Sequence, residues 1–420
     1  MRYKPLPLGE FAKNVITLTS GALVAQAIPI AVSPILTRFY SPADFGIFAV
    51  YTALAAIITV ASTGRFELAL NLPRSDLIAI HLFVLASLCV AVTALCVAAI
   101  LAILFFLVPN GTLNWTYGLL PISILFSGAT QIFTCWLNRL KCFRDIAVSR
   151  SAQGAAFAAA GIYFGGQGTS QGLILGFLVG QLICVTYLVG AGAPRLQQLR
   201  VQLRNSMLTR TATRYRDFPR MLILAHVINI ISLRLPVLLM PVSFGAAAAG
   251  LYSLSQQVIG LPMQLVGAAV SDVFRQQASV EYKRTGSCVD LYFRTFRAMA
   301  LLYLPPFLVL VVFSPDLFSF VFGEEWYRAG VLTQILAPMY YMQFVSSALS
   351  SMFIIAEKQR YDLLWQLSLI VVITGALILG WLSGSIEICT MLFSVGYCVM
   401  YSINLCLTFG FAKSRIVQDR

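Results

Sequence analysis

Residues 79–107 read AIHLFVLASLCVAVTALCVAAILAILFFL, and this stretch decides the class of the protein. It contains no Asp, Glu, Lys or Arg, and it exceeds the roughly 20 apolar residues that a helix needs to cross the hydrocarbon core of a bilayer. It lies within 77–138, a segment without formal charge that has room for a second such helix. The sequence therefore predicts transmembrane helices in this part of the chain.

The same apolar character extends along the whole chain. Of its 420 residues, 59% are hydrophobic and only 11% are charged, whereas soluble domains carry about 25% charged residues. Charges and turn-forming clusters such as Pro109-Asn110-Gly111 divide the sequence into about twelve segments of membrane-spanning length. We predict an all-α polytopic membrane protein with transmembrane helices at 15–37, 45–64, 79–107, 117–137, 146–166, 172–192, 219–240, 247–270, 298–321, 330–355, 363–382 and 388–411.

The basic residues predict the orientation of these helices. The net charge is +13, but Lys and Arg are scattered between apolar segments, which argues against a nucleic-acid partner. With the N-terminus in the cytoplasm, all 29 basic residues fall on the cytoplasmic side except Arg38, Arg234 and Arg328. This asymmetry follows the positive-inside rule, so we expect both termini in the cytoplasm.

Neither the cysteines nor the N-terminal segment indicates a cofactor or a cleaved signal. The nine Cys include no C-x-x-C pair, and most lie within apolar segments, where Cys acts as a small hydrophobic residue. We therefore expect no metal and no other cofactor. The apolar run that follows Lys13 continues to Leu36, which is too long for a signal peptide, so it is interpreted as the first transmembrane helix.

The longest connection divides the chain into two halves. We predict an N-terminal lobe at 1–193, a basic cytoplasmic loop at 194–218, and a C-terminal lobe at 219–420 that ends in a cytoplasmic tail, with six helices in each lobe. The loop contains Arg195, Arg200, Arg204, Arg210, Arg214 and Arg216. These arginines either set the topology and attract anionic lipid, or gather an anionic substrate at the cytoplasmic mouth.

The two halves resemble each other. Tyr40-x5-Gly46-x-Phe48 connects the first two predicted helices, and Phe244-x5-Gly250-x-Tyr252 connects the seventh and the eighth. A second pair of similar segments, 141–145 and 359–362, follows the fourth and the tenth helix. Because both halves begin in the cytoplasm, the pattern predicts a parallel repeat, related by an axis along the membrane normal.

Polar residues at helical spacing mark candidate substrate contacts. One face of the eighth predicted helix carries Ser253, Gln257, Gly260, Gln264, Gly267 and Ser271. Shorter polar stripes occur in the first helix (Thr19, Gln26, Ser33) and in the fourth (Ser123, Ser127, Gln131, Thr134, Asn138). For these two, helix packing is an equal alternative, since small and polar residues hold transmembrane helices together.

Arg234 lies within the predicted helix 219–240, away from the cytoplasmic charges. An arginine at mid-bilayer costs about 2.5–3.5 kcal/mol, so it should face protein or water; alternatively, it extends to the outer surface. Asn229 points about 140° away from it on a straight helix, and Arg38 has the same two interpretations as Arg234. The candidate substrate-contacting residues are Arg234, Arg38, Asn229, Gln257, Gln264 and Gln26.

The acidic residues are equally informative. No Asp or Glu lies at the centre of a predicted helix, whereas cation-exporting and proton-driven transporters usually bury one there, so an anionic substrate is favoured. Glu67 and Asp272 fall at cytoplasmic helix ends beside Arg65 and Arg275, where we expect solvated ion pairs. These four residues form a candidate cytoplasmic mouth. The chain also lacks G-x-x-x-x-G-K-[ST], H-E-x-x-H and G-x-S-x-G, so it is not expected to be an enzyme.

Several segments resemble a known family. The run 36–48, LTRFYSPADFGIF, is similar to the first periplasmic turn of the Wzx-type polysaccharide flippases. Similar segments follow in order: Tyr215-Arg216-Asp217-Phe218-Pro219, Leu235-Pro236, Phe244-Gly245, Ala249-Gly250-Leu251-Tyr252-Ser253-Leu254 and Gly260-Leu261-Pro262. The resemblance implies membership of the multidrug/oligosaccharidyl-lipid/polysaccharide (MOP) exporter superfamily, with two six-helix lobes around a V-shaped cavity. These turns identify the family better than the substrate.

The leading hypothesis is an alternating-access flippase in the bacterial inner membrane. The resemblance implies that it moves an undecaprenyl-pyrophosphate-linked oligosaccharide unit to the periplasmic leaflet for O-antigen, capsule or exopolysaccharide synthesis. Membrane lipids, a polysaccharide polymerase and chain-length machinery are the expected partners. The alternatives are a drug/cation antiporter of the same superfamily and a membrane glycosyltransferase or polymerase.

Overall fold

The computed structural model describes residues 28–73, 75–107, 114–198, 205–216, 218–262 and 267–413, and all regular structure in these ranges is helical. The all-α class predicted from the sequence is therefore confirmed. Eight of the described helices are long and apolar enough to cross a membrane. They are α2 (Pro42–Ser62), α4 (Asp76–Leu107), Trp115–Arg139, which contains α5 (Leu120–Arg139), the Gly172–Pro194 part of α7 (Gly172–Gln198), the His226–Phe244 part of α9 (Ile223–Phe244), α12 (Val289–Phe322), α15 (Gln359–Leu382) and α16 (Ile386–Lys413).

Other helices occupy the remaining predicted positions but are shorter or less apolar. They are Ile28–Phe39, α6 (Phe143–Gly166), α10 (Ala246–Pro262) and α13 (Tyr327–Leu349). Four further helices lie between these elements: α3 (Phe66–Ala69), α8 (Asn205–Arg214), α11 (Ala268–Thr285) and α14 (Met352–Ile355). The helix predicted over 247–270 coincides with α10, which is described as far as Pro262, and with the start of α11 at Ala268, while 263–266 lie outside the described residues. Of its polar stripe, Ser253 and Gln257 lie on α10 and Ser271 lies on α11.

Contacts between the helices divide the chain into two compact units. Unit 1 contains Met1–Tyr40 and Ile47–Leu235, and unit 2 contains Ser41–Gly46 and Pro236–Arg420. The boundaries fall inside α2 and α9, so each of these helices begins in one unit and ends in the other.

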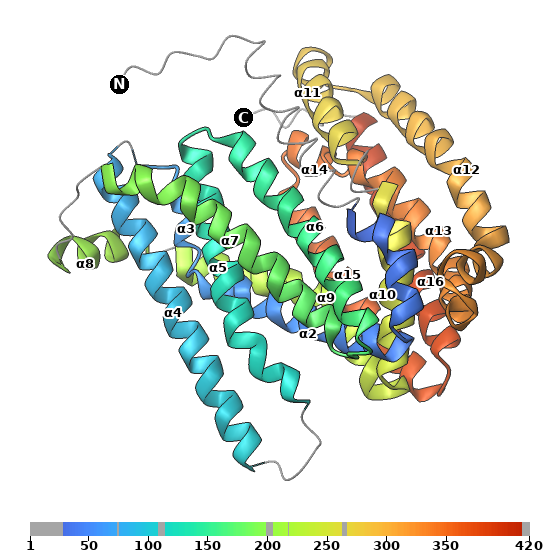
Figure 1. The fold of residues 1–420 in the computed structure, drawn as a ribbon. Helices are drawn as coiled ribbons and strands as arrows, with labels where there is room; N and C mark the ends of the chain where they lie inside the picture. Colours follow the sequence, from blue (N-terminus) through green and yellow to red (C-terminus); the bar gives the residue numbers. More distant parts are fainter. Residues whose placement is uncertain are drawn as a thin grey trace. The chain divides into compact units, whose positions relative to one another are not determined.

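In unit 1, α6 packs along α7, and α5 packs against both α4 and α7 (Figure 1). Two hydrogen bonds tie α5 to its neighbours: Tyr51 Oη lies 2.6 Å from Ser123 Oγ, and Gln181 Nε2 donates to Ser127 Oγ at 2.7 Å. Two members of the polar stripe predicted on this helix, Ser123 and Ser127, therefore hold neighbouring helices together. This agrees with the alternative interpretation of the stripe as a helix-packing surface.

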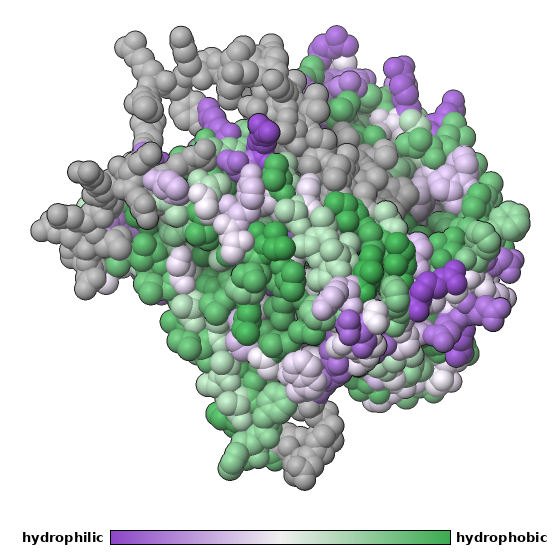
Figure 2. Space-filling model, in the orientation of Figure 1, coloured by the Kyte–Doolittle hydropathy of each residue, from purple (hydrophilic) through white to green (hydrophobic). Residues whose placement is uncertain are grey.

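The outer face of α4 is apolar. Its exposed side chains include Leu88, Val92, Leu95, Ile100, Ile103 and Phe106. Figure 2 shows a mostly hydrophobic surface over the part of the molecule that α4 occupies in Figure 1. A face of this composition is stable against lipid tails rather than water, which agrees with a membrane-spanning role for α4.

In unit 2, α12 packs along α13, α15 along α16, and α13 also contacts α10 and α16. Hydrogen bonds from side chains to backbone carbonyl oxygens connect these helices. Ser255 Oγ donates to the Ala329 carbonyl at 2.7 Å, and Trp365 Nε1 donates to the Met400 carbonyl at 2.8 Å. Such bonds satisfy polar groups that lipid cannot solvate.

The turns that resemble each other in sequence also contact each other within unit 2. A Cβ added at Gly46 would overlap with the carbonyl oxygen of Ala246, and a Cβ added at Gly250 would overlap with that of Pro42. Pro42 and Ala246 each precede their glycine by four residues. The two backbones therefore approach each other in a symmetric way, as two copies of a duplicated segment would, and only glycine allows this distance.

Candidate functional site

The structure does not bring Arg234 and Asn229 together. Both residues are on α9, where Arg234 is half-buried and Asn229 is exposed. Among the described residues, no hydrogen bond or ion pair joins Arg234 to another side chain. The planar shape of a guanidinium suits phosphate oxygens, so Arg234 stays a candidate for contact with a phosphate.

Arg38 is exposed near the end of helix Ile28–Phe39 and, like Arg234, belongs to unit 1. Gln26 and Gln264 lie outside the described residues. Gln257 is half-buried on α10, in unit 2. Each of these sites stays a prediction from the sequence.

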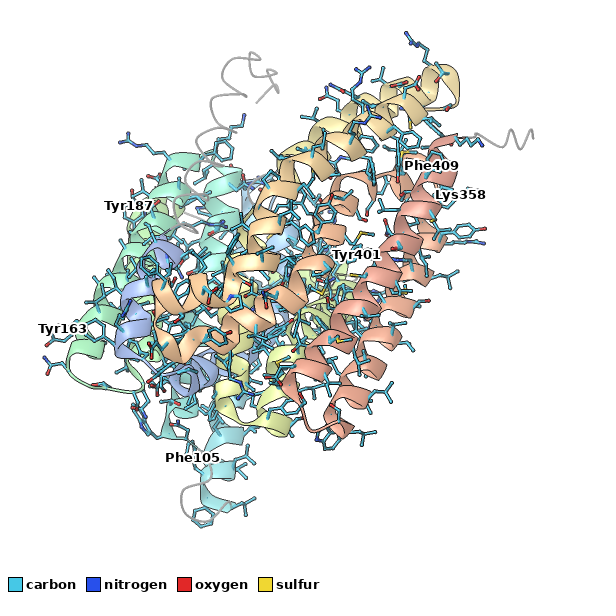
Figure 3. The ribbon with its side chains drawn as sticks, turned by 90° about the vertical axis from the view of Figure 1, so that its right-hand side faces the viewer. Phe105, Tyr163, Tyr187, Lys358, Tyr401 and Phe409 are labelled. Atoms are coloured by element: carbon cyan, nitrogen blue, oxygen red, sulfur yellow. The ribbon has the colours of Figure 1, made fainter. Side chains whose placement is uncertain are left out.

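Unit 2 contains a cluster of tyrosines and glutamines that the sequence did not reveal. The side chain of Tyr340 on α13 lies near that of Gln256 on α10, the neighbour of Gln257, and the side chain of Tyr401 on α16 lies near that of Gln343 on α13. The Tyr397 and Tyr401 rings are stacked, with centroids 5.8 Å apart. Tyr401 lies well inside this unit, whereas Lys358 and Phe409 lie nearer one end (Figure 3). Helical spacing compares residues on one helix, so it misses pairs that join different helices.

The two ion pairs of the predicted cytoplasmic mouth differ in their surroundings. Arg275 Nη2 lies 2.8 Å from Asp272 Oδ1, and the two side chains are 54% and 72% exposed, as expected for a solvated pair. The prediction is wrong for the other pair. Arg65 Nη1 lies 3.2 Å from Glu67 Oε1, but their side chains are only 10% and 3% exposed. The neighbouring residues Phe66 and Ala69 of α3 belong to a buried apolar cluster with residues of α4 and α5, so the pair is part of the interior of unit 1.

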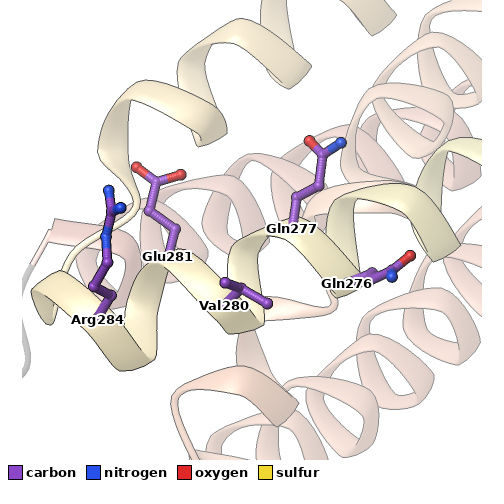
Figure 4. Close-up of a pocket in the computed structure, with 5 residues that line it drawn as sticks. All are labelled: Gln276, Gln277, Val280, Glu281 and Arg284. Carbon is purple, nitrogen blue, oxygen red and sulfur yellow. The ribbon is translucent and has the colours of Figure 1, made fainter.

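One depression lies on the surface of unit 2. Its volume is about 420 Å³, and it is lined by Gln276, Gln277, Val280, Glu281 and Arg284 (Figure 4). All five residues come from α11, and side chains from a single helix do not enclose a ligand. The depression is therefore a surface feature rather than a substrate site.

Comparisons with known proteins give a family and a fold. A family described as "polysaccharide biosynthesis protein" matches residues 35–330. The structure is similar to a lipid II flippase MurJ in an inward closed conformation, with a TM-score of 0.69 and 11% identity, over 93% of this chain and 87% of that one. It is also similar to an inward-facing multidrug resistance MATE family transporter of the MOP superfamily, with a TM-score of 0.64 and 11% identity over 93% of both chains.

A MOP superfamily transporter from Pyrococcus furiosus is a third similar structure, with a TM-score of 0.56 and 12% identity over 94% of both chains. No curated protein sequence matches the chain. The structure therefore has a fold similar to that of these transporters and is that of a multi-pass membrane protein, whereas the count of twelve transmembrane helices stays a prediction.

Proposed function

Because this chain belongs to the polysaccharide biosynthesis protein family, we propose that it is a flippase for an undecaprenyl-pyrophosphate-linked oligosaccharide unit. It moves this unit from the cytoplasmic to the periplasmic leaflet of the inner membrane for O-antigen, capsule or exopolysaccharide synthesis. The observation that carries the proposal is the family match over residues 35–330, which covers most of the chain. The fold shared with a lipid II flippase supports it, since lipid II is the cargo in that protein's name.

In the proposed topology, twelve helices form lobes at 1–193 and 219–420, joined by the basic loop 194–218, with both termini in the cytoplasm. A polymerase and chain-length machinery would take the cargo over on the periplasmic side. The protein carries out transport without being an enzyme, and no cofactor is assigned to it.

Arg234 and Arg38 are the proposed contacts for the pyrophosphate. Both are arginines outside the cytoplasmic charge clusters, and arginine binds phosphate oxygens through two parallel hydrogen bonds. Asn229, Gln26, Gln257 and Gln264 are proposed as contacts for sugar hydroxyls, because an amide both donates and accepts hydrogen bonds. The polyprenyl tail would stay in lipid, because its transfer into water is unfavourable.

A deletion strain tests the proposed function. Lipid-linked oligosaccharide intermediates and mature surface polysaccharide are quantified with and without the restored gene. We expect intermediates to accumulate on the cytoplasmic side and surface polysaccharide to disappear in the deletion strain. Unchanged surface polysaccharide would contradict the proposal.

The structural similarity to a multidrug resistance transporter favours one alternative, a drug/cation antiporter. In that case the deletion strain would become sensitive to cationic compounds while its surface polysaccharide stayed intact. Proton-coupled efflux of a cationic dye from vesicles that contain the purified protein would be the direct measurement. Against this alternative, no Asp or Glu lies at the centre of a predicted transmembrane helix.

A further inference from the structure

Helix α12 is longer than a bilayer requires. It runs from Val289 to Phe322 and contains 34 residues, which corresponds to about 51 Å at the rise of an α-helix, whereas the hydrocarbon core is about 30 Å thick. Its stretch 298–315 contains no charged residue and would cover about 27 Å, close to the thickness of the core. In a bilayer this stretch places Arg297, the charged residue that precedes it, at the depth of the lipid headgroups.

One face of α12 begins with three charged residues. Asp290, Arg294 and Arg297 follow one another at intervals of four and three residues, which places them on the same side of the helix, and all three are exposed. The same face continues with exposed apolar side chains: Leu301, Leu308 and Val312. The opposite face is buried within unit 2. Because an exposed apolar face contacts lipid in a membrane, the three charged residues form the polar end of a lipid-facing surface.

Hydrogen bonds to α16 hold the start of α12 in place. Tyr292, on the buried face, donates to the Leu405 carbonyl oxygen at 3.1 Å, and its Oη lies 2.9 Å from Thr408 Oγ1. The backbone N–H of Cys288, which precedes α12, donates to the Ala412 carbonyl oxygen at 3.0 Å. These bonds fix the first turns of the helix, so the charged side chains extend from a backbone that is already in position.

The charged side chains of this face do not form an ion pair with one another. Asp290 and Arg294 are four residues apart, yet no ion pair among the described residues joins them or connects Arg297 to a carboxylate. An exposed pair at this spacing would contribute little to stability. A lipid headgroup can therefore compete for both the carboxylate and the guanidinium groups.

The order of charges along this face matches the order of groups in an aminophospholipid. Outward from the apolar stretch, the face presents two cations, Arg297 and Arg294, and then the anion Asp290, about 6 Å beyond Arg294 along the helix axis. Outward from its acyl chains, phosphatidylethanolamine presents a phosphate and then an ammonium group. Arginine binds phosphate oxygens through paired hydrogen bonds, and an ammonium group donates up to three hydrogen bonds to acceptors such as a carboxylate.

We propose that this face of α12 is a binding site for phosphatidylethanolamine. Arg294 and Arg297 bind the phosphate, Asp290 binds the ammonium group, and the acyl chains lie along Leu301 and the apolar residues that follow it. Phosphatidylglycerol would satisfy the arginines but has no cation for Asp290, and the quaternary ammonium of phosphatidylcholine has no N–H to donate. The bound lipid would fix the depth of α12 in one leaflet. This inference goes beyond the proposed function, because the lipid binds without any cargo.

Native mass spectrometry of the full-length protein in detergent micelles tests the site. Phosphatidylethanolamine, phosphatidylglycerol and phosphatidylcholine with identical acyl chains are added in equal amounts, and the ratio of lipid-bound to lipid-free protein is measured for the first bound lipid. We expect phosphatidylethanolamine to bind about threefold more than either of the other lipids, because the contact with Asp290 is an exposed ion pair. Equal binding of the three lipids, or a preference for phosphatidylglycerol, would overturn the proposal.

Three variants with exposed changes separate the two contacts. Asp290→Asn should bind phosphatidylethanolamine and phosphatidylglycerol equally, because the ammonium group loses its partner. The double variant Arg294→Gln/Arg297→Gln should bind both lipids about tenfold less, since the phosphate loses its charged donors. Asp272→Asn is the matched control: it removes an exposed carboxylate from α11 and should keep the preference of the wild-type protein. A preference for phosphatidylethanolamine that persists in Asp290→Asn, or unchanged binding in the double variant, would contradict the assignment of these residues.

Discussion

At the scale of single residues, spacing alone did not distinguish the two ion pairs of the predicted mouth. Arg65 and Glu67 are two residues apart, and Arg275 and Asp272 are three apart, so both looked like local surface pairs. The difference arises from what packs around them. Phe66 and Leu70 lie in a buried cluster with Leu82 and Ile132, whereas α11 exposes both members of its pair. Burial is a property of tertiary packing, and the sequence contains it only indirectly.

Arg234 allows a direct test of the proposed phosphate contact. Hydrogen bonds to a charged group contribute about 1.5–3 kcal/mol, so Arg234→Ala should lower transport about tenfold or more. Arg234→Lys should retain part of the activity, because lysine keeps the charge but loses the paired geometry. The measurement is surface polysaccharide per amount of membrane-inserted protein. The exposed Arg284→Ala is the matched control, and full export by a normally abundant Arg234→Ala protein would exclude this residue from substrate binding.

The glycine contact within unit 2 makes a second residue-scale prediction. Gly46→Ala and Gly250→Ala each place a methyl group on a backbone carbonyl, so the helices must move apart. Overpacking of this kind costs about 1–3 kcal/mol, which should appear as a lower midpoint of thermal unfolding. Gly166→Ala is the control, since an added Cβ there meets no atom within 4 Å. An unchanged midpoint in Gly46→Ala would show that the two backbones are not held at this distance.

At the scale of helices, the sequence predicted where elements lie better than how they contact each other. The charge-free stretch that follows Asp76 lies within α4, and the helix predicted over 298–321 lies within α12. Pro315 is inside α12, which continues to Phe322. A proline is tolerated inside a transmembrane helix where neighbouring helices or side chains give the freed backbone carbonyl another partner, so such contacts are not determined by the local sequence.

Arg139 should be essential for the connection between α3 and α4. Its side chain is 13% exposed and bonds two carbonyl oxygens as well as Asp76. Arg139→Ala should therefore lower the free energy of unfolding by about 3 kcal/mol, since buried acceptors lose a charged donor. Chemical denaturation in detergent measures this difference.

The comparison variant for Arg139 is Arg275→Ala, which removes an exposed pair. That change should cost less than about 1 kcal/mol, because water replaces a surface ion pair. Similar losses in both variants would mean that the carbonyl contacts of Arg139 do not stabilise the fold.

At the scale of the whole molecule, composition and periodicity were sufficient for the class and for most helix positions. They were not sufficient for the site. Gln256 and Tyr340, and likewise Gln343 and Tyr401, lie close together although they belong to helices that are far apart in sequence. Only the fold brings such residues together, and a single sequence contains no signal that pairs them.

The orientation in the membrane determines the direction of the proposed transport, and it rests on the distribution of Lys and Arg. The test introduces single cysteines into a variant without native cysteines. Ser170→Cys places one between α6 and α7, and Thr285→Cys places one at the last residue of α11. Both positions are exposed. A membrane-impermeant thiol reagent should label Ser170→Cys in cells with a permeable outer membrane, and Thr285→Cys only after the inner membrane is opened. The opposite pattern would place both termini in the periplasm. The arginine-rich loop would then face away from the compartment in which the lipid-linked precursor is made.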